Sequence, residues 1–254
     1  MKLSRRRFFK RSAVQAAGIA SIPMILSVTF PEDDKKKKDK FTIFPQNGTV
    51  LFQGDSITDA GRNRERQYPN DASSFGTGYA LMAGAGLLKK LPEKSLQIYN
   101  RGISGNKVFQ LRDRWNEDCL DLKADVLSIL IGVNDYWHKR NGEYNGTVEI
   151  YENDYRALLK RTKEALPDVK LVICEPFSLT GGSAIGEGWQ DEFAPYRKAA
   201  TKLAKEFDTL YVPYQKIFDE AMKHAPATYW SGDGVHPSMA GAQLMASAWL
   251  KVVK

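Results

Sequence analysis

The chain has 254 residues, 43% of them hydrophobic, which suffices for one α/β domain with a full core. Its formal net charge of +7 lies entirely in residues 1–40, because residues 41–254 carry equal numbers of basic and acidic side chains. A neutral body lacks the basic surface that phosphate backbones require, so we exclude nucleic acid as a partner.

The amino terminus has the pattern of an export signal. Ser4-Arg5-Arg6-Arg7-Phe8-Phe9-Lys10 is similar to the twin-arginine export motif, and a modest apolar stretch follows at residues 13–30. We expect residues 1–30 to be a signal or uncleaved anchor, 31–40 a charged linker and 41–254 the folded domain. This predicts a periplasmic or extracellular protein, with residues 13–30 as the only membrane tether; a basic or amphipathic tail is the alternative.

Strands and helices alternate along the rest of the chain. The apolar runs predict strands at 49–53, 96–99, 125–131, 169–174 and 209–212. Helical spacing predicts helices at 78–91, from 108 to 115, and at 148–165, 195–207, 214–224 and 238–252. This alternation indicates a five-stranded parallel sheet covered on both faces, a three-layer α/β/α sandwich of the flavodoxin type.

Four short blocks of polar residues and glycine follow predicted strands. They read Gly54-Asp55-Ser56-Ile57-Thr58, Asn100-Arg101-Gly102-Ile103-Ser104-Gly105, Gly132-Val133-Asn134-Asp135 and Asp233-Gly234-Val235-His236. Because the carboxyl ends of parallel strands converge on one crevice, we expect the four blocks to meet there.

Together these residue types supply the parts of a serine esterase. Ser56 can act as a nucleophile, Asn134 can donate to a developing oxyanion, and Asp233 can fold back on His236 to orient its ring. Taken singly, each block has a structural alternative: a turn or cap for Ser56 and Asn134, and a surface pair for Asp233 and His236. His138 is the reserve candidate for the base.

In their order and spacing the blocks resemble the SGNH (GDSL-type) hydrolase superfamily. The resemblance implies that Ser56 is the nucleophile, that Asp233 and His236 complete the triad, and that Ser56, Gly105 and Asn134 form the oxyanion hole. It implies ester hydrolysis without a metal or organic cofactor. The G-x-S-x-G elbow of other serine hydrolases and the H-E-x-x-H metal motif are both absent from the sequence.

Aromatic residues beside two of the blocks suggest a carbohydrate substrate. Tyr136, Trp137, Tyr229 and Trp230 could stack on sugar rings or could equally be core packing; Asp55 and His138 are further candidate substrate contacts. We expect a small-acyl, chiefly acetyl, esterase acting on a glycan. The alternatives are a lysophospholipase or broad carboxylesterase, and a glycan-binding module on a decayed hydrolase fold.

The two cysteines do not make a disulfide framework. Cys119 and Cys174 are the only cysteines in the chain, and Cys174 ends an apolar run. We expect both thiols to be unpaired.

Overall fold

The computed structural model describes residues 41–254. The expected signal at residues 1–30 and linker at 31–40 therefore lie outside the described residues. Within 41–254, no helix is long and apolar enough to cross a membrane.

The described chain forms one parallel sheet with helices on both of its faces. Its strands are β1 (Thr49–Gly54), β2 (Gln97–Asn100), β3 (Val126–Leu130), β4 (Lys170–Cys174) and β5 (Leu210–Val212). They lie in the order β2-β1-β3-β4-β5, and every adjacent pair is parallel. This confirms the predicted α/β sandwich.

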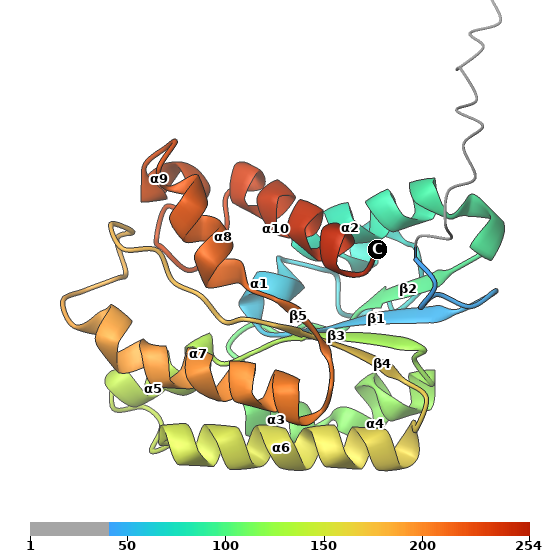
Figure 1. Cartoon of the computed structure of the whole chain (residues 1–254), viewed down its shortest axis with the longest axis horizontal. Helices are drawn as coiled ribbons and strands as arrows, with labels where there is room; N and C mark the ends of the chain where they lie inside the picture. The colour runs from blue at the N-terminus through green and yellow to red at the C-terminus, as the bar shows by residue number, and fades with distance from the viewer. Residues whose placement is uncertain (1–40) are drawn as a thin grey trace, which may run out of the picture. The chain divides into compact units, whose positions relative to one another are not determined.

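Two helical layers cover the sheet. The α-helices are α1 (Ser56–Asp59), α2 (Tyr79–Lys90), α3 (Val108–Asp113), α4 (Trp115–Asp118), α5 (Val133–Arg140), α6 (Val148–Ala165), α7 (Trp189–Glu206), α8 (Tyr214–Ala221), α9 (Ala227–Trp230) and α10 (Met239–Val252). Short 3₁₀ turns are η1 (Ala72–Ser74), η2 (Pro92–Lys94) and η3 (Leu120–Leu122). Helices α2, α8 and α10 lie on one face of the sheet, and α3, α6 and α7 on the other (Figure 1).

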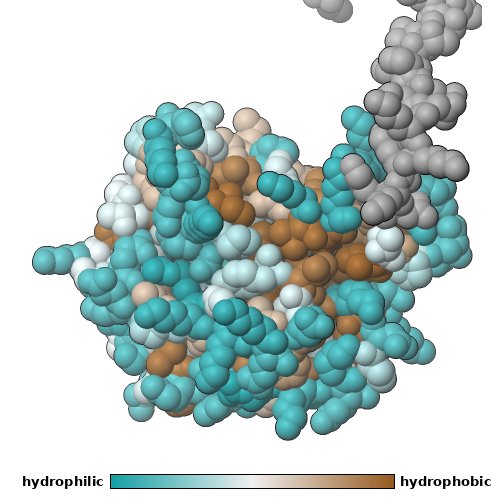
Figure 2. Space-filling view, viewed as in Figure 1, coloured by the Kyte–Doolittle hydropathy of each residue, from teal (hydrophilic) through white to brown (hydrophobic). Residues whose placement is uncertain are grey.

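The amphipathic pattern of the long helices explains these layers. In α6 the buried side chains recur at helical spacing, at Tyr151, Tyr155, Leu158, Leu159 and Thr162. The opposite face is charged, and the surface over α6 and α7 is mostly hydrophilic (Figure 2). The central strand β3 is buried along its whole length, as expected for a strand covered on both faces.

Two helix boundaries differ from the prediction. Helix α7 begins at Trp189 rather than Pro195, and Pro195 lies inside it. The proline is exposed, so water can satisfy the carbonyl four residues earlier that loses its donor. Helix α5 begins inside the third block, at Val133, where the sequence analysis predicts no helix.

Both cysteines are free and buried, which confirms the expectation. Cys174 Sγ lies 3.5 Å from the hydroxyl of Ser128 in β3. The same Ser128 hydroxyl accepts a 2.9 Å hydrogen bond from the indole N–H of Trp249 in α10, and both side chains are fully buried. This bond ties the closing helix to the centre of the sheet.

Replacing Ser128 by Ala should therefore destabilise the fold. The indole N–H of Trp249 would lose its acceptor inside the core, at a cost of about 1–3 kcal/mol in the free energy of unfolding. Urea denaturation of Ser128→Ala checks this value. Ser247→Ala is the matched control, because Ser247 lies on the same helix and is exposed; its effect should stay within about 0.5 kcal/mol. Equal stability of the two variants would contradict the assignment.

Candidate active site

The sheet brings the first three blocks side by side at its carboxyl edge. Block one follows β1, block two follows β2 and block three follows β3, and these are neighbouring strands. The backbone N–H of Ile103 donates to the carbonyl of Gly54 at 3.1 Å, which joins blocks one and two. The amide Nδ2 of Asn134 donates to the carbonyl of Asn106 at 3.2 Å, which joins blocks two and three.

The fourth block does not directly follow a strand as expected, because α8 and α9 stand between β5 and Asp233; it reaches the same edge through His236. Ser56 stands at the first position of α1, and its Oγ lies 2.7 Å from His236 Nε2. His236 Nδ1 lies 2.6 Å from Asp233 Oδ2. A carboxylate can only accept, so the ring N–H is on Nδ1 and Nε2 is left to accept from Ser56 Oγ.

Asp233 is held by its own loop. Its Oδ1 accepts from the backbone N–H groups of Val235 at 2.9 Å and His236 at 2.8 Å. Burial would raise the pKa of Asp233, but these bonds and the His236 ring outweigh burial and hold its pKa well below the ordinary value. The carboxylate is therefore ionised beside the imidazole at neutral pH.

His236 responds to this neighbour in the opposite direction. The hydrogen bond to Asp233 raises the pKa of His236 above its ordinary value, against the lowering effect of burial. The other expected base, His138, lies elsewhere: its Nδ1 is 3.5 Å from Lys107 Nζ and 3.3 Å from a Glu143 carboxylate oxygen. The structure thus brings His236, not His138, to Ser56.

The expected oxyanion donors lie in two adjoining turns. Gly105 has a φ of +82° with open space where a Cβ would point, so its need for glycine is conformational. Asn134 is buried in the first turn of α5, and one of its two amide N–H groups is used on Asn106. The second N–H remains for another acceptor.

A small cavity of about 180 Å³ adjoins Ser56 and His236. Small or apolar residues form much of its wall, namely Ile57, Ala60, Gly78, Pro237 and Ala242, together with Thr77 and Tyr79. Of the expected oxyanion donors, only Ser56 lines this cavity. Within residues 41–254, no group of three His, Cys, Asp or Glu side chains is placed to hold a metal ion.

Comparison with known proteins gives the family. Residues 52–244 match the GDSL-like lipase/acylhydrolase family. The chain belongs to this family. It is therefore a carboxylic ester hydrolase.

The relatives span nearly all of the described part. The chain is 35% identical over 210 residues to an acetylxylan esterase of Geobacillus stearothermophilus, covering 80% of this chain and 93% of that protein. A solved structure of an acetylxylan esterase from the same organism has a TM-score of 0.74 at 32% identity, covering 83% of this chain and 95% of the other. A structure from Parabacteroides merdae named as a GDSL-like lipase has a TM-score of 0.82 at 54% identity, covering 85% and 99%.

Two of the expected substrate contacts, Asp55 and Tyr136, are buried in the structure. Asp55 is buried and caps α1, its Oδ1 accepting from the Ile57 N–H at 3.0 Å. Tyr136 is buried and stacks on Phe193, with its hydroxyl bonded to Glu192 at 3.0 Å. Both side chains have structural roles, and neither belongs to the proposed substrate site.

The remaining aromatic candidates are more open. Trp137 is partly buried and meets Trp189 edge to face. Tyr229 is 57% exposed and packs edge to face on the partly buried Trp230, in the short helix before the Asp233 loop. These three residues and His138, which is partly exposed, remain candidate substrate contacts.

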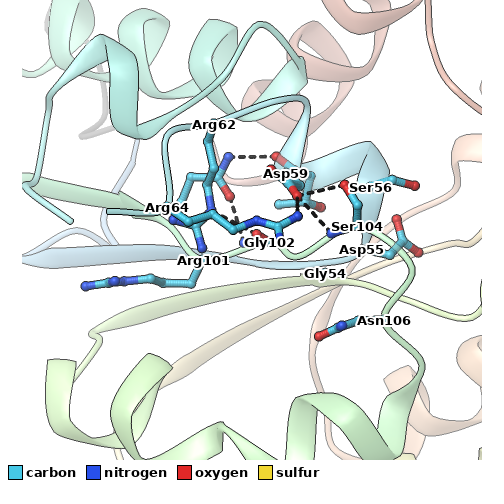
Figure 3. Close-up of polar contacts among 12 residues, drawn as sticks. Gly54, Asp55, Ser56, Asp59, Arg62, Arg64, Arg101, Gly102, Ser104 and Asn106 are labelled. Carbon is cyan, nitrogen blue, oxygen red and sulfur yellow. Dashed lines mark hydrogen bonds and ion pairs between the residues drawn. The ribbon is translucent and has the colours of Figure 1, made fainter. Parts of the chain in front are cut away.

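The structure adds polar residues that sequence reasoning missed. Ser231 Oγ donates to Asp233 Oδ1 at 3.0 Å and lies 2.8 Å from the carbonyl of His236. Asp59, one turn after Ser56, accepts from Ser104 and from Arg64 (Figure 3). A serine two residues before Asp233 was a visible signal in the sequence, whereas nothing there showed the partner of Asp59.

Two buried carboxyls underlie the site. Burial raises the pKa of Asp55 and of Asp135 to about 7. The Oδ2 atom of each has no hydrogen-bond partner among the described residues. In the folded protein each carboxyl therefore keeps a proton that the unfolded chain loses near pH 4.

The raised pKa values of Asp55 and Asp135 make the free energy of unfolding fall as pH rises from about 4 to about 7, because the folded state binds more protons than the unfolded state in that window. Asp55→Asn keeps an N-cap acceptor but does not titrate. With rising pH, the free energy of unfolding of this variant should fall less steeply than that of the parent. For one group, the two slopes should differ by up to about 1 kcal/mol per pH unit. Urea denaturation of both proteins at pH 5 and pH 8 measures the difference; identical slopes would contradict it.

Proposed function

We propose that this chain is a serine esterase that removes acetyl groups from a carbohydrate through an acyl-enzyme. The observation that carries the proposal is the chain of two hydrogen bonds, 2.7 Å from Ser56 Oγ to His236 Nε2 and 2.6 Å from His236 Nδ1 to Asp233 Oδ2. This is the arrangement that a nucleophilic serine, its base and an orienting carboxylate require.

In the proposed mechanism His236 takes the proton of Ser56 as Oγ attacks the ester carbonyl. The tetrahedral oxyanion accepts hydrogen bonds from the backbone N–H groups of Ser56 and Gly105 and from the Asn134 amide. The C–O bond to the alcohol then breaks, and His236 gives its proton to the departing alcohol. In the second step His236 activates water, which attacks the acyl carbonyl, and the proton returns to Ser56 as acetate leaves.

The acyl group and the alcohol are inferred from three observations. A cavity of about 180 Å³ beside Ser56 favours a short acyl chain. The relative that is 35% identical is an acetylxylan esterase. Solved catalytic mutants of an acetylxylan esterase from the same organism replace a serine or an aspartate by alanine. Exposed Tyr229 and partly buried Trp137 and Trp230 offer aromatic faces for sugar rings.

Export is a separate part of the proposal. It is supported by the twin-arginine pattern at residues 4–10 and the apolar stretch at 13–30. An exported enzyme would meet polymeric glycans directly.

Ser56→Ala should abolish hydrolysis of an aryl acetate, lowering kcat by more than about 10⁴-fold, because the nucleophile is lost while the oxyanion donors remain. The melting temperature should stay near that of the parent protein, since Ser56 lies at the site's surface rather than in the core. An active-serine phosphonate should label the parent protein at Ser56 and leave the variant unlabelled. Retained turnover by the folded variant would refute the mechanism.

A substrate panel tests the acyl and alcohol assignments. Acetate should be released from acetylated xylan and xylo-oligosaccharides, and aryl acetates should be cleaved at least about tenfold faster than aryl octanoates, because the cavity is short of room for longer chains. Ser56→Ala is the control for background hydrolysis. Activity confined to long-chain lipid esters would sink the carbohydrate assignment, and sugar binding without hydrolysis would indicate a binding module.

A further inference from the structure

Asp59 links the helix that carries Ser56 to the turn that carries Gly105. It is the last residue of α1 and only 1% exposed. Its Oδ2 accepts from the backbone N–H of Ser104 at 2.8 Å and from the Ser104 hydroxyl at 2.7 Å. The guanidinium of Arg64 donates to the same oxygen (Figure 3). We call Asp59, Arg64 and Ser104 the Asp59 clamp.

The clamp acts on the residue directly before Gly105. With both its N–H and its hydroxyl bound to one oxygen, Ser104 has little freedom of backbone or side-chain rotation. The turn closes with the Asn106 N–H donating to the Ile103 carbonyl at 3.2 Å. The direction of the Gly105 N–H is set by the peptide plane between Ser104 and Gly105. This peptide lies between the Ser104 N–H, held by Asp59, and the Asn106 N–H, held by the Ile103 carbonyl, so the two bonds together restrain that donor.

The two segments also touch through their backbones. A Cβ on Gly102 would lie 2.5 Å from the backbone nitrogen of Asp59, so only glycine allows this approach. Arg62 Nε donates to the carbonyl of Gly102 at 2.8 Å from the same loop. The clamp therefore sits on a close contact between α1 and block two rather than across open solvent.

The charge of Asp59 suits this task. Burial would raise the pKa of its carboxyl, but the hydrogen bonds from Ser104 and the Arg64 guanidinium outweigh burial and lower the pKa below its ordinary value. Hydrogen bonds to an ionised acceptor are stronger than those between neutral groups. The other oxygen, Oδ1, is buried without a hydrogen-bond partner among the described residues, so the restraint runs through Oδ2.

We propose that Asp59 is a positioning residue that aims the Gly105 N–H at the oxyanion by holding Ser104 against the helix of the nucleophile. The inference rests on the proposed function, because it gives Gly105 the role of an oxyanion donor. An oxyanion donor acts only at its correct distance and direction, so loosening the turn lowers kcat more than it changes substrate binding.

Asp59→Asn tests the clamp. An amide can still accept from Ser104, but it loses the negative charge and places an NH₂ where Oδ1 was. We expect kcat for an aryl acetate to fall about 10- to 100-fold, part of the loss typical for a missing oxyanion donor, with KM within about threefold. Phosphonylation of Ser56 should slow by a similar factor, and the acid limb of the pH profile of kcat/KM should not move, because His236 is untouched.

Asp71→Asn is the matched control. Asp71 also accepts from a serine N–H and hydroxyl, those of Ser73, and also pairs with an arginine, Arg66, but it caps η1 instead of the oxyanion turn. Its kcat should stay within about twofold of the parent value. Three outcomes would overturn the inference: Asp71→Asn lowers kcat as much as Asp59→Asn does, Asp59→Asn keeps kcat within about threefold of the parent value, or Asp59→Asn raises KM without lowering kcat.

A second measurement does not depend on activity. Deuterium uptake by the segment 103–106 should rise in Asp59→Asn and stay at the parent level in Asp71→Asn; unchanged uptake in both overturns the clamp. If Ser56→Ala retained activity, the proposed function would fail while this measurement still decided whether Asp59 holds the turn.

Ser104→Ala covers the case in which Asp59→Asn does not fold. It removes only the hydroxyl bond and keeps the backbone bond to Asp59. We expect kcat to fall about 3- to 10-fold at unchanged KM, and Ser104→Thr, which keeps the hydroxyl, to restore most of it. Parent kcat in Ser104→Ala would overturn the inference.

Discussion

The loop from Ser231 to His236 fixes the imidazole through hydrogen bonds that end on Asp233 and Ser231. Asp233 uses one oxygen for the backbone of its own loop and the other for the His236 ring. The Ser231 hydroxyl lies within hydrogen-bond distance of the same carboxylate and of the His236 carbonyl, and its single proton is shared between these two acceptors. Because the ring N–H must face Asp233, the lone pair of Nε2 can face only Ser56. The distance between Ser56 and His236, 180 positions apart in the chain, is thus set by local bonds within six residues and by the packing of that loop on the sheet edge.

Sequence reasoning predicts the fold correctly and selects the four blocks that the structure brings together, because both depend on strong, local signals. Apolar runs alternating with helical spacing leave few arrangements other than a parallel sheet with two helical layers. Once the strand order is β2-β1-β3, the first three blocks must lie at neighbouring strand ends. The helix boundaries are harder to predict from the sequence, since Pro195 is tolerated inside α7 where the missing hydrogen bond faces water.

Burial and long-range partners are what the sequence could not show. Tyr136 directly follows the third block, yet the helical turn of α5 points it into an aromatic cluster instead of the cleft. In the sequence Asp59 is an ordinary polar residue three positions after Ser56, and its partner Ser104 is 45 residues away. Such contacts depend on how closely two backbones approach. A glycine such as Gly102 permits a close approach, but the sequence does not show which segment lies against it.

The carboxyl groups around the site divide by the donors they receive. Asp59 and Asp233 each accept several hydrogen bonds and keep low pKa values despite burial. Asp55 accepts one hydrogen bond from the Ile57 N–H and Asp135 accepts one from the Val108 N–H. Burial raises the pKa of each of these two carboxyls to about 7. The division follows from the balance between burial, which raises the pKa of a carboxyl group, and donated hydrogen bonds, which lower it. Negative charge is therefore held on Asp233, which contacts His236, and on Asp59, which contacts Ser104.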